Sequence, residues 1–381
     1  MRKIFNTFVV LLLIGTVISY AIWTGQRPVS LYLSDLRIQL AVNEGQPGVG
    51  GNLLGIQTEL VPGDYQSREH LHRKLASYLQ QARDLGLLNA KTIVVLPEHI
   101  GTWLFASGEK DQLYQSASLK EAMIWLSVSN PLKFLRALYD ADGKHRLNDA
   151  HLRMKAPEMA EDYQALFGGL AKEFGVTLVA GSIVLPEPYL ENGQLRLGSG
   201  PLYNISIVFD HDGQPIGQPQ RQLYPSFTER NYIQPAPETA LNVLDTPAGR
   251  LGVLIGSDSW YPRNYAQLNN HDAELIAVPA FVVGNGRWNK PWRGYKSRSA
   301  PADVGLKPGE ISEGEAWRRL TLTGHAPAST ARAGVSVFMR GQFWDQGSSG
   351  RSFISRQEPS DNDQVGTDRP GRGARLINLW L

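Results

Sequence analysis

The sequence predicts an α/β fold with a parallel sheet, preceded by one apolar helix at the N-terminus. Two observations predict the sheet. Residues 53–58 and 92–96 are short runs of strand length, and residues 68–85 between them place apolar side chains at helical spacing. A strand, a helix and a second strand in this order form a parallel unit. The third observation is an apolar run over residues 4–23, which is long enough to cross a bilayer.

The apolar run predicts a transmembrane anchor. Twenty helical residues cover about 30 Å, the thickness of the hydrocarbon layer. Arg2 and Lys3 precede the run, so we expect a single-pass protein of the cytoplasmic membrane with its body on the periplasmic, extracytoplasmic side. Residues 19–21, Ser-Tyr-Ala, offer a cleavage site that would release a secreted protein. The run continues beyond this site, which favours a retained helix over residues 1–23.

Three further segments follow the anchor. Residues 24–51 end in a string of glycine, proline and polar residues at 43–51, which predicts a flexible linker. We expect the folded domain over residues 52–356. Residues 357–373 are rich in Asp, Pro, Gly and Arg, so we expect a flexible tail over 357–381. It ends in an apolar hexapeptide, 376–381, that could dock on a partner or weakly on the chain itself.

Helical and strand patterns alternate along the rest of the domain. They are a helix at 157–174, a strand at 177–185, paired strands at 204–210 and after 213, and strands at 252–255 and 274–279 on either side of a helix after Pro262. This alternation is typical of an α/β domain.

Composition excludes several classes of protein. The 381 residues contain no cysteine, which excludes disulfides, thiolate-bound zinc and iron–sulfur clusters. A formal net charge of +2 argues against nucleic acid as a partner. His70 and His72 are two residues apart on a predicted helix and face different sides, which argues against a metal site. We expect no cofactor and no metal.

A series of short motifs occurs in a fixed order along most of the chain. They are Gln57, Leu96-Pro97-Glu98, Ala180-Gly181-Ser182, Asn204, residues 208–213, Leu223-Tyr224-Pro225 with Glu229, residues 249–252 and Val278-Pro279-Ala280. In this order they resemble the nitrilase (carbon-nitrogen hydrolase) superfamily. The resemblance implies a four-layer α-β-β-α sandwich, often assembled into dimers, so a homo-oligomer is one expectation. Against this pattern, residues 115–152 look like an insertion.

The superfamily uses a glutamate base, a cysteine thiolate and a lysine ammonium that stabilises the oxyanion. The resemblance makes Glu98 the base; it follows a buried strand, where parallel sheets open into clefts, although it can also serve only as a turn cap. At the lysine position, strict spacing places Gln220. An offset of one residue places Arg221 at the lysine position, where its guanidinium would keep the positive charge in a wider group. Arg221 is equally well explained as a cation exposed to solvent at the strand end.

The nucleophile position differs most from the superfamily, because Gly256 stands where the cysteine is expected. Removal of a nucleophile costs on the order of a millionfold in turnover. Ser257 is the nearest hydroxyl. Neighbouring side chains of an extended segment point to opposite faces, however, so only a shifted turn would aim Ser257 at Glu98. Ser259 lies further into the turn.

Three aromatic residues are candidates for substrate binding. Trp260 follows the nucleophile turn, and Phe281 follows the segment where the superfamily lines its pocket. Trp288 lies in the run 287–296, which alternates cations and aromatic rings and suits a ligand or an interface. The plain alternative is a loop whose rings pack on the sandwich.

Three functional hypotheses follow. The first is a pseudoenzyme: a membrane-anchored scaffold that binds a small amide-, nitrile- or acyl-containing ligand, or a protein partner, in the cell envelope. The second is an active amide or acyl hydrolase or transferase that uses Ser257 or a water activated by Glu98. The third is that Gly256 replaces the cysteine of an ordinary hydrolase. We favour the first, because no cysteine occurs anywhere in the chain.

Overall fold

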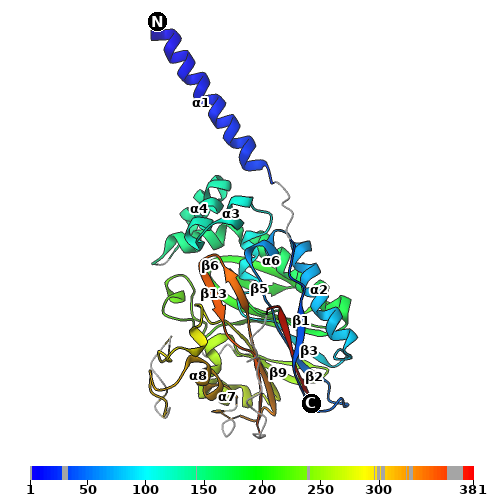
Figure 1. The fold of residues 1–381 in the computed structure, drawn as a ribbon. Helices are drawn as coiled ribbons and strands as arrows, with labels where there is room; N and C mark the ends of the chain where they lie inside the picture. Colours follow the sequence, from blue (N-terminus) through cyan, green and yellow to red (C-terminus); the bar gives the residue numbers. More distant parts are fainter. Residues whose placement is uncertain are drawn as a thin grey trace.

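The structure, a computed structural model, describes residues 2–27, 33–142, 144–237, 241–295, 297, 301, 305–322, 324–325, 329–357 and 372–381. Figure 1 shows one long helix, α1 (Arg2–Gly25), that projects from a body of β-sheets and flanking helices. The body contains two large sheets and a small hairpin.

The larger sheet has eight strands. They are β1 (Ile38–Glu44), β2 (Asn52–Gln57), β3 (Thr92–Val95), β4 (Thr177–Val179), β5 (Ile183–Glu191), β6 (Gln194–Phe209), β7 (Pro215–Arg221) and β15 (Ala374–Trp380). Their order is β1-β15-β2-β3-β4-β6-β5, and β7 pairs with β6 outside this path. β2, β3 and β4 run parallel. Every residue of these three strands is buried, which explains why their sequences do not alternate between apolar and polar residues.

The smaller sheet has five strands. They are β8 (Val243–Thr246), β9 (Gly249–Val253), β10 (Leu275–Ala280), β11 (Ala333–Phe338) and β14 (Phe353–Arg356), in the order β14-β11-β10-β9-β8. β9, β10 and β11 run parallel. A separate hairpin is formed by β12 (Arg340–Phe343) and β13 (Gln346–Ser349).

Helices cover the outer faces of both sheets. They are α2 (Arg68–Asp84) and α6 (Arg146–Phe174) on the larger sheet, and α7 (Pro262–Asn269) and α8 (Glu313–Leu320) on the smaller one. Between the sheets lies a third apolar cluster, in which Leu53 and Val95 of the larger sheet pack with Val253 and Val335 of the smaller one. The layers therefore follow the order helix, sheet, sheet, helix that the resemblance implied.

The helices begin at capping residues. The Ser67 side chain accepts a hydrogen bond from the main-chain N–H of His70 at the start of α2. At the start of α8, Ser312 and Glu315 form a capping box. These local signals lie next to the apolar patterns, so helix positions followed from the sequence more readily than strand partners did.

The predicted linker over residues 24–51 is wrong in part. Its residues 38–44 form β1, which pairs in parallel with β15. β1 is an edge strand in which Val42 is the one buried residue, so its sequence carries little apolar pattern. The domain therefore begins before residue 52.

The predicted flexible tail is wrong at its end. β15 lies between β1 and β2, and all of its residues are buried. Asn378 in its middle accepts a hydrogen bond from Asn52 Nδ2 at 2.6 Å and donates to Asn43 Oδ1 at 2.8 Å. The polar composition before β15 concealed this strand. Residues 358–371, which were expected to be disordered, lie outside the described residues.

Helix α6 begins at Arg146, earlier than the predicted residue 157, and Pro157 lies inside it. Extensive burial along α6 offsets the main-chain donor that the proline lacks. The predicted insertion forms α4 (Leu119–Ser129), α5 (Pro131–Asp140) and the start of α6, next to the short α3 (Asp111–Gln115). In Figure 1 these helices lie at the base of α1.

Candidate functional site

Glu98 follows the end of β3 and is 4% exposed. Its Oε1 accepts hydrogen bonds from Asn204 Nδ2 of β6 at 3.1 Å and from Gln222 Nε2, just beyond β7, at 3.2 Å. Asn204 Nδ2 also donates to Gln222 Oε1 at 3.1 Å. The Glu98 carboxylate is therefore held by side-chain amides from two other strands at the end of the larger sheet.

Gly256 faces this carboxylate. It opens the 3-10 turn η4 (Gly256–Trp260) after β9, with a φ of 55°, which glycine adopts at the least cost. A β-carbon at this position would lie 2.9 and 3.0 Å from the two Glu98 carboxylate oxygens and 3.2 Å from Gln222 Nε2. The structure thus brings positions 98 and 256 together, and residue 256 contributes no side chain.

The turn serines point to main-chain groups. The Ser257 hydroxyl donates to the carbonyl oxygen of Tyr224 at 2.9 Å. The buried Ser259 hydroxyl donates to the carbonyl oxygen of Gly256 at 2.9 Å. Both hydroxyl protons are used in these bonds, so neither serine presents its proton to Glu98. The shifted turn that a Ser257 nucleophile requires is not the conformation observed.

The prediction that Arg221 supplies an oxyanion-stabilising cation is wrong. Its guanidinium lies over the ring of Tyr203, 4.1 Å from the centroid, and Gln220 hydrogen-bonds main-chain groups. Gln222 reaches Glu98 instead, because alternation along the extended chain turns residues 221 and 222 to opposite sides. At this strand end, the side chain that contacts the Glu98 carboxylate is therefore a neutral amide and not the Arg221 guanidinium.

His99 forms a charged pair that sequence reasoning missed. Its Nε2 lies 3.1 Å from Glu229 Oε1 and 3.9 Å from Glu98 Oε1. Burial lowers the pKa of His99, but the hydrogen bond with Glu229 and the charges of Glu98 and Glu229 outweigh burial and raise this pKa above its ordinary value. Burial raises the pKa of Glu229, but the hydrogen bond with His99 and the charge of His99 outweigh burial and lower this pKa to about 2.

The signal for this pair was weak in the sequence. Glu229 served there only as a family landmark, and the one indication for His99 was its place directly after Glu98. The structure gives His99 a left-handed φ of 62°, which turns its ring toward Glu229.

The ligand atoms of Glu98, His99 and Glu229 lie within 4.8 Å of one another, a spacing compatible with a metal ion. Each side chain already has protein partners, however. His99 Nδ1 lies 3.2 Å from Thr102 Oγ1, and Glu229 Oε2 accepts a hydrogen bond from the main-chain N–H of Ser226 at 2.7 Å. These contacts account for the group as an ion-pair network.

Asp258 fastens the turn to the strand end. It is fully buried, and its carboxylate oxygens accept the main-chain N–H groups of Leu223 and Tyr224 at 2.9 and 2.7 Å. Burial raises the pKa of Asp258 well above its usual range, although these two hydrogen bonds act in the opposite direction. The contacts of Asp258 place Gly256 opposite Gln222.

The three predicted substrate-binding aromatics divide between site and core. Phe281 lies beside the site, with its ring edge-on to the ring of His99 at 5.7 Å. Trp260 and Trp288 are 0% and 4% exposed and belong to the apolar cluster of the smaller sheet, so the structure gives no support to their predicted role. The plain alternative of rings packed on the sandwich holds for both. Lys296, the last residue of the run 287–296, lies outside the described residues.

A surface hollow lies elsewhere on the molecule. Residues of α6 and β6 line it, among them Ala160, Gln164, Leu195 and Leu197. It shares no residue with the Glu98 site, so the hollow gives no support to a substrate pocket at that site.

Comparison with protein families matches residues 56–300, more than half of the chain, to the carbon-nitrogen hydrolase family. Among curated relatives, the chain is 27% identical over 163 residues to an N-carbamoylputrescine amidase of Solanum lycopersicum, covering 42% of this chain and 43% of that one. It is 27% identical over 174 residues to a deaminated glutathione amidase of Yersinia enterocolitica, covering 43% and 54%. The chain thus spans about half the length of the curated relatives it matches.

Among solved structures, a double mutant of the amidase from Nesterenkonia sp. AN1 has a TM-score of 0.52 and 12% identity, covering 88% of this chain and 93% of that one. A second structure of an amidase from Nesterenkonia sp. has a TM-score of 0.52 and 14% identity, covering 88% and 92%. At such identities the likeness shows the fold alone. A mutant of the AN1 amidase shows covalent addition of the acetamide moiety of fluoroacetamide at the active-site cysteine.

Proposed function

Because this chain belongs to the carbon-nitrogen hydrolase family, we propose that it is a member that has lost covalent catalysis and binds a small amide-, nitrile- or acyl-containing ligand in the cell envelope. The observation that carries the proposal is the place opposite Glu98, where Gly256 offers no side chain. A second candidate, an active amide or acyl hydrolase or transferase, rests on the retained Glu98 carboxylate.

Two parts of the covalent chemistry have no counterpart among the residues that the structure describes. Attack on an amide carbon needs a nucleophile, but the chain has no cysteine and the Ser257 hydroxyl donates to a main-chain carbonyl. The developing oxyanion needs a cation or strong donors. Among the described residues, Asn204 and Gln222 place neutral amides on Glu98, whereas the cation His99 lies 3.9 Å away and is paired with Glu229. Loss of both parts supports a pseudoenzyme.

The remaining groups suit recognition. The Glu98 carboxylate accepts hydrogen bonds from two side-chain amides. It would accept a hydrogen bond from the N–H of an amide ligand in the same way. The side chains of His99 and Glu229 are 13% and 20% exposed, more than that of Glu98 at 5%. We therefore expect a ligand to approach Glu98 past this pair.

Thermal unfolding of the full chain in detergent tests ligand binding. We expect small amides such as acetamide and propionamide to raise the Tm of the natural chain but not that of Glu98→Gln. Glu158→Gln is the matched control, because this carboxylate pairs with Lys133 on the helical insertion, and it should respond like the natural chain. Equal shifts in all three proteins, or no shift with any amide, nitrile or ester, would contradict binding at Glu98.

Turnover on the same compounds tests the loss of catalysis. We expect none from the natural chain, from Ser257→Ala or from Glu98→Gln. Turnover that disappears in Ser257→Ala would establish the serine alternative, and turnover that disappears only in Glu98→Gln would establish a water activated by Glu98. A Gly256→Cys/Gln222→Lys variant restores a thiol and a cation beside Glu98, and any activity gained there would show that the assay is sensitive enough.

We also propose that α1 anchors the body at the extracytoplasmic face of the cytoplasmic membrane. α1 has 24 residues, and its 18-residue apolar window has a mean hydropathy of 2.1 and is not buried against the body. A signal sequence has the same composition. A retained helix is favoured by contacts near its end, where the Tyr20 hydroxyl donates to the carbonyl oxygen of Val128 and Trp23 lies against Trp125.

A further inference from the structure

The helical insertion exposes six large apolar side chains, here together called the insertion face. They are Ile124 and Val128 of α4, Leu132, Leu135 and Tyr139 of α5, and Leu147 near the start of α6. Leu132 and Tyr139 are 82% and 87% exposed. Leu135 and Tyr139 follow Leu132 by three and seven residues, so the three side chains share one side of α5. Ala137 is the only buried residue among those of α5. An amphipathic helix usually turns such a side toward the core, so this face needs another occupant.

The end of α1 is fixed to the same helices. The Tyr20 hydroxyl donates to the carbonyl oxygen of Val128 at 2.7 Å, and the rings of Trp23 and Trp125 lie 6.5 Å apart. The Lys110 ammonium lies 4.3 Å from the ring centroid of Trp23 and donates to the Trp23 carbonyl oxygen. These contacts restrict the angle between α1 and the insertion.

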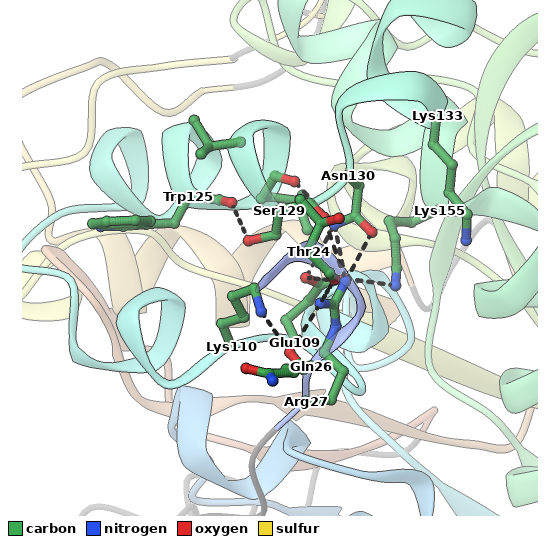
Figure 2. A network of polar contacts seen from close by, with 12 residues as sticks. Thr24, Gln26, Arg27, Glu109, Lys110, Trp125, Ser129, Asn130, Lys133 and Lys155 are labelled. Carbon is green, nitrogen blue, oxygen red and sulfur yellow. Dashed lines mark hydrogen bonds and ion pairs between the residues drawn. The ribbon is translucent and has the colours of Figure 1, made fainter. Parts of the chain in front are cut away.

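Figure 2 shows a polar network at this junction. The buried Glu109 carboxylate lies 2.9 Å from Lys155 Nζ and accepts a hydrogen bond from Asn130 Nδ2 at 3.0 Å. Arg27, just beyond α1, lies 3.8 Å from Glu109 and donates to Asn130 Oδ1 at 3.2 Å. The network joins the end of α1 to α6 and to the junction of α4 and α5. It therefore reinforces the fixed orientation of α1.

The junction between α1 and the insertion also sets how deep the insertion would lie relative to a membrane. In membrane proteins, Tyr and Trp side chains concentrate at the boundary between lipid and water. Tyr20 and Trp23 stack at 5.9 Å near the C-terminal end of α1, and Tyr20 contacts Val128 of the insertion face. Figure 1 shows α1 leaving the body at the end where α4 lies. If α1 spans a bilayer, the insertion face begins at the level of the lipid headgroups.

The charges of residues 119–147 suit a position at the level of the lipid headgroups. Exposed cations, among them Lys120, Arg136 and Lys144, flank the apolar side chains. Over residues 119–147, five Lys and Arg residues oppose three Asp and Glu residues, a formal net charge of 5 − 3 = +2. Apolar residues flanked by cations are typical of surfaces that bind anionic lipids.

We propose that the insertion face docks on an anionic phospholipid bilayer, in the leaflet from which α1 emerges. Interfacial helices bury their apolar side by about 5–10 Å in the boundary between headgroups and acyl chains. The inference rests on the proposed membrane span of α1 and adds a second attachment. Together the two attachments fix the orientation of the body relative to the membrane.

Single cysteine labels test the docking, because the natural chain has no cysteine of its own. The full-length variants Leu135→Cys and Tyr139→Cys carry a nitrobenzoxadiazole fluorophore and are reconstituted in vesicles of phosphatidylglycerol and phosphatidylethanolamine. Leu85→Cys is the matched control, since Leu85 is also exposed but follows α2. Leu12→Cys reports on the span of α1. We expect blue-shifted emission at 135 and 139, quenching by nitroxide lipids, and several-fold less quenching by aqueous iodide than at 85.

Two results would overturn the docking. Equal access of iodide to positions 135, 139 and 85 would show that the face stays in water, and the label at 12 would then show whether α1 still spans the bilayer. Shielding from iodide without quenching by nitroxide lipids would show that a protein, such as a second copy of this chain, covers the face.

Discussion

Gly256 combines a left-handed backbone with close approach to Glu98, and both features resist a larger side chain. A left-handed conformation costs a residue with a side chain roughly 1–2 kcal/mol. An added β-carbon must also displace a carboxylate oxygen that lies 2.9 Å away. Gly175 is a matched control, because its φ is 64° and nothing lies within 4 Å of the place a β-carbon would take.

We therefore expect Gly256→Ala to lower the free energy of unfolding by about 2–3 kcal/mol and Gly175→Ala by about 1 kcal/mol, both measured by urea titration. Equal losses in the two variants would mean that Glu98 moves aside at no cost and that the site is not rigid.

The pair of His99 and Glu229 predicts a pH-dependent stability. The pKa of Glu229 is lowered from 4.5 to about 2, so its contribution is complete above 4.5 and is lost as the pH falls toward 2. The pKa of His99 is raised from 6.5, so its contribution is complete below 6.5 and is lost as the pH rises through the folded-state pKa. The pair of His99 and Glu229 therefore stabilises the fold most between pH 4.5 and pH 6.5, the ordinary pKa values of the two side chains.

We expect the natural chain to exceed His99→Asn in unfolding free energy by more at about pH 5.5 than at about pH 9, as measured by urea titration. His271→Asn, at an exposed histidine, should have little effect at either pH. A loss at His99 that does not change with pH would argue against the ion pair.

Single site residues were predictable where a strand end fixes them. Glu98 and Gly256 follow apolar strands, and the structure brings them together. The side chain opposite them was not predictable, because the pairing of β6 with β7 shifts register between Ser206 and Val208. Counting residues along the chain gave Gln220 or Arg221, whereas Gln222 is the one that contacts Glu98.

Among the elements, local sequence predicted the buried strands and missed the paired ends of the chain. β2, β3 and β10 are wholly buried, so their apolar runs are conspicuous. β1 and β15 owe their conformation chiefly to each other and to β2. The apolar end of the chain was visible in the sequence, but its pairing partners were not, because pairing of distant segments leaves no local signal.

The hydrogen-bonded side-chain amides of Asn52, Asn378 and Asn43 give a test of the pairing of β15 with its neighbours. Asn378→Ala removes the partner of Asn52 Nδ2 and of Asn43 Oδ1 in a buried place. We expect a loss of about 1–3 kcal/mol in unfolding free energy, measured by urea titration. Leu381→Ala, directly after β15, should cost less because Leu381 is only partly buried. Additive losses in an Asn43→Ala/Asn378→Ala variant would show that the two amides do not act together.

For the whole molecule, the contacts of α1 with the insertion favour an uncleaved anchor. We expect the mature chain to keep its N-terminus, as measured by mass, and to stay in the membrane fraction after an alkaline carbonate wash. A Leu12→Arg/Leu13→Arg variant interrupts the apolar run and should be released by the wash. A mature chain that begins at Ile22 would establish a cleaved signal instead.

The place of β15 in the larger sheet has a consequence for the timing of folding. Asn52 and Asn378 are hydrogen-bonded neighbours, yet they are 326 residues apart in the chain. β15 separates β1 from β2, so β1 can join the larger sheet only after residues 374–380 have been made. If the body crosses the membrane as proposed, the larger sheet stays incomplete until residues 374–380 have crossed too.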